Sequence, residues 1–271
     1  MLRRLLQVGV LTPLTFALCA WPALRGSIGF AAGALGPDPI AALTHASGWW
    51  AMGLLLATLA VTPLRRVSVW LSQAVALRFG RRIGDWNALI RQRRQLGLWS
   101  FAYAVLHLGL YVGFDIGIGA GTLHAYAQDL AERPFIALGS AALLLLLPLA
   151  LTSTRAAIRR LKRHWLRLHR LVYAAAVLAA LHGVLQAKPG QLSAGVFAGT
   201  TLALLAFRLA AQAWGQRAQP GGSTGAAIAP ASAARAAANA APAARRCGEA
   251  RPACGRRPRP PSGTTRRSRC S

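Results

Sequence analysis

The stretch HWLRLHRLVYAAAVLAALHG, from His164 to Gly183, decides the fold class of this chain. It is basic at its start, and its apolar run is too long and too clean for a surface helix. A bilayer core needs about 20 mostly apolar residues to be crossed, and this stretch supplies nearly that. Polar groups at membrane depth are costly and tend to mark function, so His169 and His182 inside such a helix indicate a site. Because neutral imidazole is a common ligand of haem iron, we interpret this helix as one wall of a haem site.

The composition is that of a membrane protein. The 271 residues are 54% hydrophobic and 14% charged, with a mean hydropathy of +0.38. The formal net charge of +26 lies in short clusters between apolar runs, as the positive-inside rule predicts, and not as a nucleic-acid-binding surface. The four cysteines form no C-x-x-C pair, which gives no support to a thioredoxin site, an attached c-type haem or a cysteine zinc site.

Five further apolar runs are long enough to cross a membrane, so we predict an all-α, six-helix integral membrane bundle. These runs are residues 5–24, 45–64, 95–114, 134–152 and 193–212. The first run also fits a signal peptide, but no small-x-small cleavage site follows it, which favours a retained helix. Residues 26–44 are expected to form a loop, and the amphipathic part of the basic segment, residues 67–79, is expected to lie on the membrane surface.

The positive charges predict that both termini are cytoplasmic. If the N-terminus is inside, 29 of the 32 Lys and Arg residues lie on inner segments, and only Arg25, Arg133 and Lys188 lie on outer loops. The chain then divides into a first helix with its outer loop, a haem-binding core, a sixth helix and a tail. The boundaries are 1–44, 45–190, 191–214 and 215–271.

The tail is rich in Ala, Pro, Gly, Ser and Arg and cannot bury enough surface to fold alone. We expect a disordered cytoplasmic segment near anionic lipid. No aromatic residues alternate with its arginines, so RNA binding is disfavoured and no nucleic-acid partner is expected.

Three of the six histidines have no special place in this scheme. His124 falls in an outer loop and His164 in a basic inner segment, where ordinary solvated residues are expected. His45 opens the second span, where it either caps the helix at the interface or contacts a haem or quinone.

The other three histidines lie within spans. At about 1.5 Å per residue from the inner face, His107 lies roughly 18 Å deep, His182 roughly 25 Å and His169 roughly 6 Å. His107 and His182 can therefore meet in the outer half of the membrane and ligate one haem iron axially. The alternative is that these histidines only form hydrogen bonds between helices.

His169 has no such partner at its depth. On a straight helix it lies roughly 140° around the axis from His182, so it either serves a second haem or exchanges with His182 as a ligand. Arg93, Arg94 and Arg170 are candidates to anchor haem propionates, because guanidinium pairs bidentately with carboxylate. The alternative is that they are topology charges at the membrane border.

Three segments resemble the MsrQ family, also called YedZ, within the ferric-reductase-like transmembrane group. They are HASGWWAMGLLLATLAVTPLRR (45–66), RRQLGLWSFAYAVLHLGLY (93–111) and LTSTRAAIRRLKRHWLRLHRLVY (151–173), with LHG following at 181–183. The resemblance covers about residues 5–212. His107, His169 and His182 match the family's intramembrane histidines, and His45 matches the histidine that opens the second helix. An insert around 67–87 and the arginine-rich tail depart from the family pattern.

The resemblance implies a multi-pass protein of the bacterial inner membrane that binds haem b and is associated with FMN. It implies that electrons come from the quinone pool and pass to MsrP, a periplasmic molybdenum-cofactor enzyme that repairs oxidised methionines. We expect an electron-transfer subunit and not a self-sufficient enzyme, because no nucleotide-binding module follows the sixth span. The alternatives are a ferric-reductase-like cytochrome b that works with a separate flavin reductase, and a non-redox membrane scaffold.

Overall fold

The computed structural model describes residues 8–76, 80–187 and 192–217. Within these ranges the chain forms helices and no strands. Six of the helices are long and apolar enough to cross a membrane, judged by length and composition. The prediction of an all-α membrane protein with six spans is therefore confirmed. The predicted disordered tail lies, apart from its first three residues, outside the described residues.

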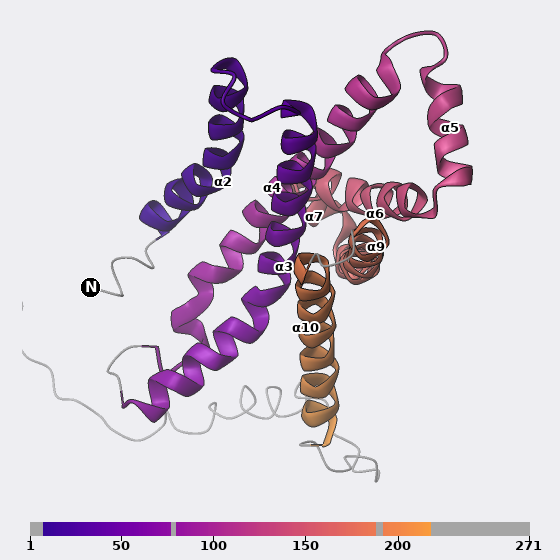
Figure 1. Ribbon diagram of the computed structural model, residues 1–271. Helices are drawn as coiled ribbons and strands as arrows, with labels where there is room; N and C mark the ends of the chain where they lie inside the picture. The colour runs from indigo at the N-terminus through magenta and orange to yellow at the C-terminus, as the bar shows by residue number, and fades with distance from the viewer. Residues whose placement is uncertain (1–7, 77–79, 188–191, 218–271) are drawn as a thin grey trace, which may run out of the picture. The chain divides into compact units, whose positions relative to one another are not determined.

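The elements follow one another along the chain as a series of long helices joined by short ones (Figure 1). They are α2 (Val8–Ala31), α3 (Pro39–Ala74), the 3₁₀-helix η1 (Ile83–Trp86), α4 (Asn87–Leu110), the π-helix η2 (Tyr111–Gly117), α5 (Thr122–Glu132), α6 (Pro134–Leu151), α7 (Arg155–Leu161), α8 (Arg163–Leu168), α9 (Leu171–Gln186) and α10 (Leu192–Arg217).

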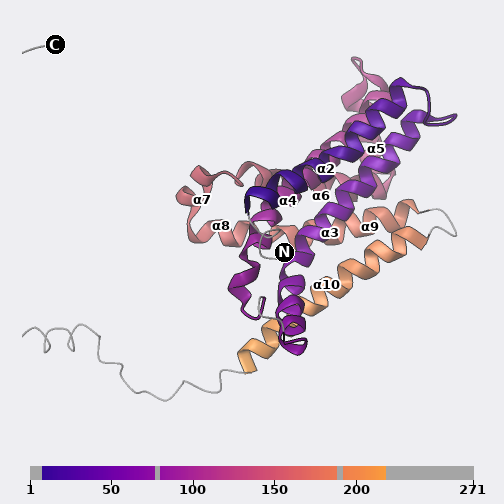
Figure 2. The same cartoon turned by 90° about the vertical axis from the view of Figure 1, so that its left-hand side faces the viewer.

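Two helix pairs form the centre of the bundle. The first pair is α3 with α4, the second is α6 with α9, and α4 also contacts α6. Helix α2 lies beside α3 and α4 (Figure 2), and α10 packs on α9 and α3. The core between the pairs is aliphatic, and Ala175 and Ala176 of α9 are fully buried in it. Such small residues let membrane helices approach closely.

Helix α3 is longer than the predicted second span. Asp38 caps it, because its Oδ1 accepts a hydrogen bond from the Ala41 backbone N–H at 2.9 Å, and Pro39 occupies the first turn. The helix therefore begins six residues before His45, and the predicted loop shortens to residues 32–38.

The other end of α3 corrects a second prediction. The helix continues to Ala74, so most of residues 67–79 prolong α3 and do not form a separate surface segment. Helix α4 correspondingly begins at Asn87, eight residues before the predicted start of the third span. Arg65 of α3 donates a hydrogen bond to Asn87 at 2.8 Å, which joins the two extensions.

The stretch 164–183, predicted as one helix, is interrupted. Helix α8 ends before His169, and α9 begins at Leu171. At the junction the N–H of Arg170 bonds to the carbonyl of Arg167, three residues back, which tightens the turn. The angle of roughly 140° calculated for a straight helix therefore does not apply to His169 and His182.

Helix α5 was not predicted. The segment assigned to an outer loop contains this helix of 11 residues, and His124 lies in it. Figure 1 shows α5 beside the bundle, leading into α6.

Arg208 connects α10 to α9 and α3 by hydrogen bonds. Its guanidinium donates to the Tyr173 hydroxyl of α9, to the Leu59 carbonyl of α3 at 3.0 Å and to Thr62 Oγ1 at 3.2 Å. The two terminal nitrogens of this intramembrane cation thus donate to three groups on two neighbouring helices, while its buried Nε has no hydrogen-bond partner within the ranges that the structure describes.

Candidate haem site

The structure brings His107 of α4 and His182 of α9 together. Their ring centroids lie 6.1 Å apart, and the ring planes are inclined by 79°. The estimated depths of the two residues predicted that they could meet, and in the structure the two rings are neighbours in an edge-to-face arrangement at the junction of the two helix pairs.

Each imidazole is oriented by a backbone carbonyl. Nδ1 of His107 lies 2.8 Å from the Thr44 oxygen, and Nδ1 of His182 lies 2.6 Å from the Phe135 oxygen. A carbonyl oxygen only accepts hydrogen bonds, so each Nδ1 carries the proton and each Nε2 keeps its lone pair. This is the tautomer and the type of partner that metal-ligating histidines use.

A glycine makes room for each ring. A Cβ built on Gly48 of α3 would lie 3.1 Å from Cε1 and Nδ1 of His107, and one on Gly139 of α6 would lie 2.9 Å from Nδ1 of His182. Larger residues at these two positions would displace the imidazoles.

The surroundings of His107 and His182 have the same arrangement of carbonyl and glycine. In each, the glycine stands four residues after the residue whose carbonyl accepts the bond: Thr44 and Gly48 in α3, Phe135 and Gly139 in α6. In an α-helix the carbonyl of residue i points at residue i+4. A missing side chain there leaves the carbonyl open to a ring from the neighbouring helix. Sequence reasoning missed both glycines, and the only signal in the sequence was the presence of a glycine within each of these two spans.

A cavity of about 240 Å³ contains both histidines. Its walls are mainly apolar side chains of α3, α4, α6 and α9, with contributions from η2 and α10. The few polar groups at the wall include Thr44, whose buried hydroxyl oxygen has no hydrogen-bond partner in the described part of the chain. His45 also lines this cavity, which is compatible with the predicted cofactor contact but does not test it.

The two imidazoles would fit as ligands of a haem iron. Imidazole–metal bonds are about 2.0–2.1 Å long, so two imidazoles on opposite sides of one ion have centroids about 6 Å apart. The observed separation is 6.1 Å. Among the described residues no cluster of three or more His, Cys, Asp or Glu could hold a metal ion.

His169 lies elsewhere. Its Nε2 is 3.3 Å from Thr152 Oγ1, and its ring stacks on Trp165 with centroids 4.0 Å apart. It does not line the cavity that holds His107 and His182. The structure thus separates it from the pair, and its proposed role as a ligand remains a prediction.

The three predicted propionate-binding arginines also lie outside the cavity wall. Arg93 precedes His107 by fourteen residues on α4, or about 21 Å along the axis. Arg93 is half-buried and close enough to His169 for their charges to interact, whereas Arg94 and Arg170 are exposed. Any cofactor contact of these arginines would therefore belong to the His169 region.

Comparison with known proteins gives a consistent result. A family model described as "Ferric reductase like transmembrane component" matches residues 47–180. A protein of Xanthomonas axonopodis pv. citri, named "Protein-methionine-sulfoxide reductase heme-binding subunit MsrQ", is 42% identical over 176 residues, which cover 65% of this chain and 72% of the relative. The protein of the same name from Rhodospirillum rubrum is 42% identical over 195 residues, covering 72% of this chain and 85% of the relative.

Proposed function

Because the chain belongs to the MsrQ family of haem-binding subunits of protein-methionine-sulfoxide reductases, we propose that it transfers electrons through a haem b held between His107 and His182. The observation that supports this most directly is the geometry of the pair. Two rings stand 6.1 Å apart, and each Nδ1 is engaged by a carbonyl, which leaves each Nε2 available to a metal.

The protein's own residues would hold and isolate the cofactor. Haem b bound there would supply one-electron exchange at its iron. The Thr44 and Phe135 carbonyls fix the tautomer and direction of the ligands and raise their basicity. The mainly apolar cavity wall would limit contact between water and the cofactor, which influences the redox potential of a bound metal group.

The remaining parts of the electron route rest on the family and on the charge pattern. We propose the membrane quinone pool as electron donor, FMN as an associated cofactor, and the periplasmic MsrP as acceptor. We also propose the bacterial inner membrane as location, with both termini in the cytoplasm. In that orientation the His107–His182 pair lies nearer the periplasmic face, where MsrP would receive the electrons.

The His169 region lies toward the opposite face in the same orientation. His169 stacks on Trp165 and lies near Arg93, so an imidazole and a cation are both present there. We propose it as a second redox-cofactor region on the quinone side, with Arg93 as the candidate partner of an anionic group and Arg94 and Arg170 nearer solvent.

The test is the reduced-minus-oxidised haem spectrum of purified variants, normalised to protein. His107→Ala should lose most haem, because the described part of α4 carries no other histidine. His182→Ala should also lose haem, and His124→Ala on α5 should match the wild type. Full occupancy in His107→Ala would refute the ligand pair.

A second measurement tests the route. The reduced wild-type protein should be reoxidised when MsrP and a methionine sulfoxide substrate are added, and a quinol should reduce it again. Reduction only by a separate flavin reductase, with no transfer to MsrP, would favour the ferric-reductase-like alternative. If the purified wild-type protein contains no haem, the non-redox membrane scaffold is the only one of the three candidate functions that remains.

A further inference from the structure

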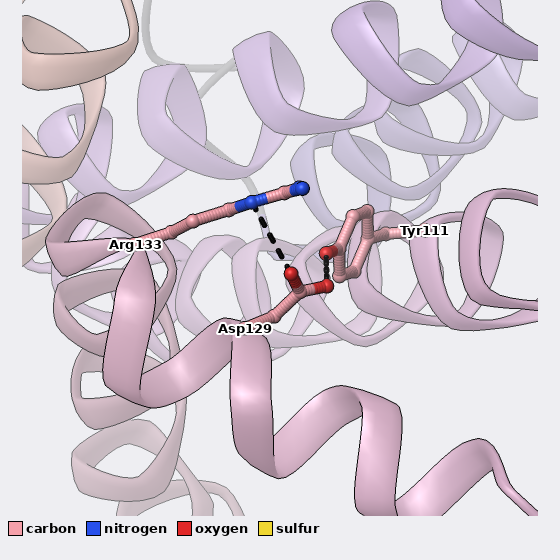
Figure 3. Close-up of polar contacts among 3 residues, drawn as sticks. All are labelled: Tyr111, Asp129 and Arg133. Atoms are coloured by element: carbon pink, nitrogen blue, oxygen red, sulfur yellow. Dashed lines mark hydrogen bonds and ion pairs between the residues drawn. The ribbon is translucent and has the colours of Figure 1, made fainter.

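Asp129 joins three elements at one end of the bundle (Figure 3). The Tyr111 hydroxyl donates to one oxygen of its carboxylate, and Nε of Arg133 lies 3.2 Å from the other. Asp129 is on α5, Tyr111 is the first residue of η2, and Arg133 lies between α5 and α6. One carboxylate therefore binds the end of α4, through Tyr111, to the start of α6.

Both partners adjoin the His107–His182 site. Tyr111 lines the cavity, and its backbone N–H bonds to the His107 carbonyl one turn earlier. Arg133 caps α6: its carbonyl accepts from the N–H groups of Ile136 and Ala137 at 2.9 and 3.3 Å. It thereby fixes the first turn of α6, which contains the Phe135 carbonyl that orients His182.

A second contact fixes α5 to the same helix. The hydroxyls of Tyr126 and Ser140 lie 2.6 Å apart. Ser140 lines the cavity and follows Gly139, the residue that makes room for the His182 ring. Helix α5 thus contacts α6 through Ser140 and the residue before α6 through Arg133.

We propose that Asp129 is a positioning residue for the candidate haem site. It sets the distance between the end of α4, which carries His107, and the first turn of α6, which orients His182. This inference rests on the proposed haem ligation, since it concerns the same pair of imidazoles.

The two bonds of Asp129 are unequal. Side-chain exposure is 17% for Asp129 and 53% for Arg133, and exposed ion pairs contribute little. The bond from the half-buried Tyr111 to the carboxylate is charge-assisted and shielded, so it is the stronger of the two. Loss of the Tyr111 hydroxyl should therefore perturb the site more than loss of the Arg133 guanidinium.

The experiment compares Asp129→Ala with Glu132→Ala in the full chain carrying haem. Glu132 is an exposed carboxylate on the last turn of the same helix, so both variants remove one negative charge from α5. Three properties are measured: the haem midpoint potential, the electron paramagnetic resonance spectrum of the ferric state, and the rate of haem release to apomyoglobin. Tyr111→Phe and Arg133→Gln complete the series.

Asp129→Ala should raise the midpoint potential, because a weaker bond from Nδ1 to the carbonyl makes imidazole a less basic ligand and stabilises ferric iron less. Haem release should be faster by about tenfold or more, as for other residues that orient metal ligands. Tyr111→Phe should act in the same direction, Arg133→Gln less, and Glu132→Ala should match the wild type.

Wild-type potential, spectrum and release rate in Asp129→Ala would overturn the proposal, as would equal effects of Asp129→Ala and Glu132→Ala. If Asp129→Ala does not fold, Tyr111→Phe, which removes a single oxygen atom, decides by the same criteria. Failure of the underlying haem assignment is distinguishable, because it would appear as haem retained in His107→Ala whatever Asp129→Ala does.

Discussion

Gly139→Ala tests whether the shape of the helix backbone determines cofactor binding. The new Cβ would lie 2.9 Å from Nδ1, 3.0 Å from Cε1 and 3.3 Å from Cγ of His182. The ring must therefore move by several tenths of an ångström, away from its 2.6 Å contact with the Phe135 oxygen. Overpacking of this kind costs about 1–3 kcal/mol. If this cost destabilises the haem-bound state alone, haem affinity should drop by roughly 5- to 150-fold.

The assay is haem titration of the apoprotein followed by absorbance, with haem release as a second readout. The control is Gly109→Ala on α4, where a Cβ would meet nothing within 4 Å. Alanine replaces glycine inside a helix in both variants, so their gain in helix propensity is alike. Wild-type affinity and release rate in Gly139→Ala would refute the argument that the glycine accommodates a metal-ligating ring.

The remaining predictions concern packing and orientation. Arg208→Ala should destabilise the protein by about 1–3 kcal/mol, because partners such as the carbonyl of the fully buried Leu59 lose their donor. Thermal unfolding in detergent should show this loss, whereas Leu209→Ala, at a side chain that is 67% exposed, should have little effect. A reporter active only in the cytoplasm should be active when fused after Gln212 and silent when inserted at Gly119. The reverse pattern would contradict the charge argument for both termini.

Hydropathy predicted which segments cross the membrane, because a span needs only length and apolar composition. It did not predict where the helices end. Helix α3 continues ten residues past Leu64, since leaving the apolar layer does not break a helix whose backbone bonds can continue. Hydropathy does not reveal the interruption at His169 either, because hydropathy reports the apolar composition of a segment and not its backbone geometry.

The candidate site was predictable in depth but not in detail. Counting residues placed His107 and His182 at compatible heights, because axial rise is nearly constant in a helix. The orientation of each imidazole ring depends on which backbone atoms lie next to it, and these atoms belong to other helices. The Thr44 and Phe135 carbonyls carry no sequence signature of their own, since every residue has a carbonyl.

The repeated spacing of carbonyl and glycine makes the site a junction of two similar units. One unit is the α3–α4 pair, in which a carbonyl of α3 orients His107 of α4. The other is the α6–α9 pair, in which a carbonyl of α6 orients His182 of α9. A small shift of one pair against the other would change the separation of the two Nε2 atoms but not the direction of either. The separation of the two Nε2 atoms is then the one quantity that such a shift changes. A bound iron would resist a change in this separation, and contacts such as that of Asp129 would limit it.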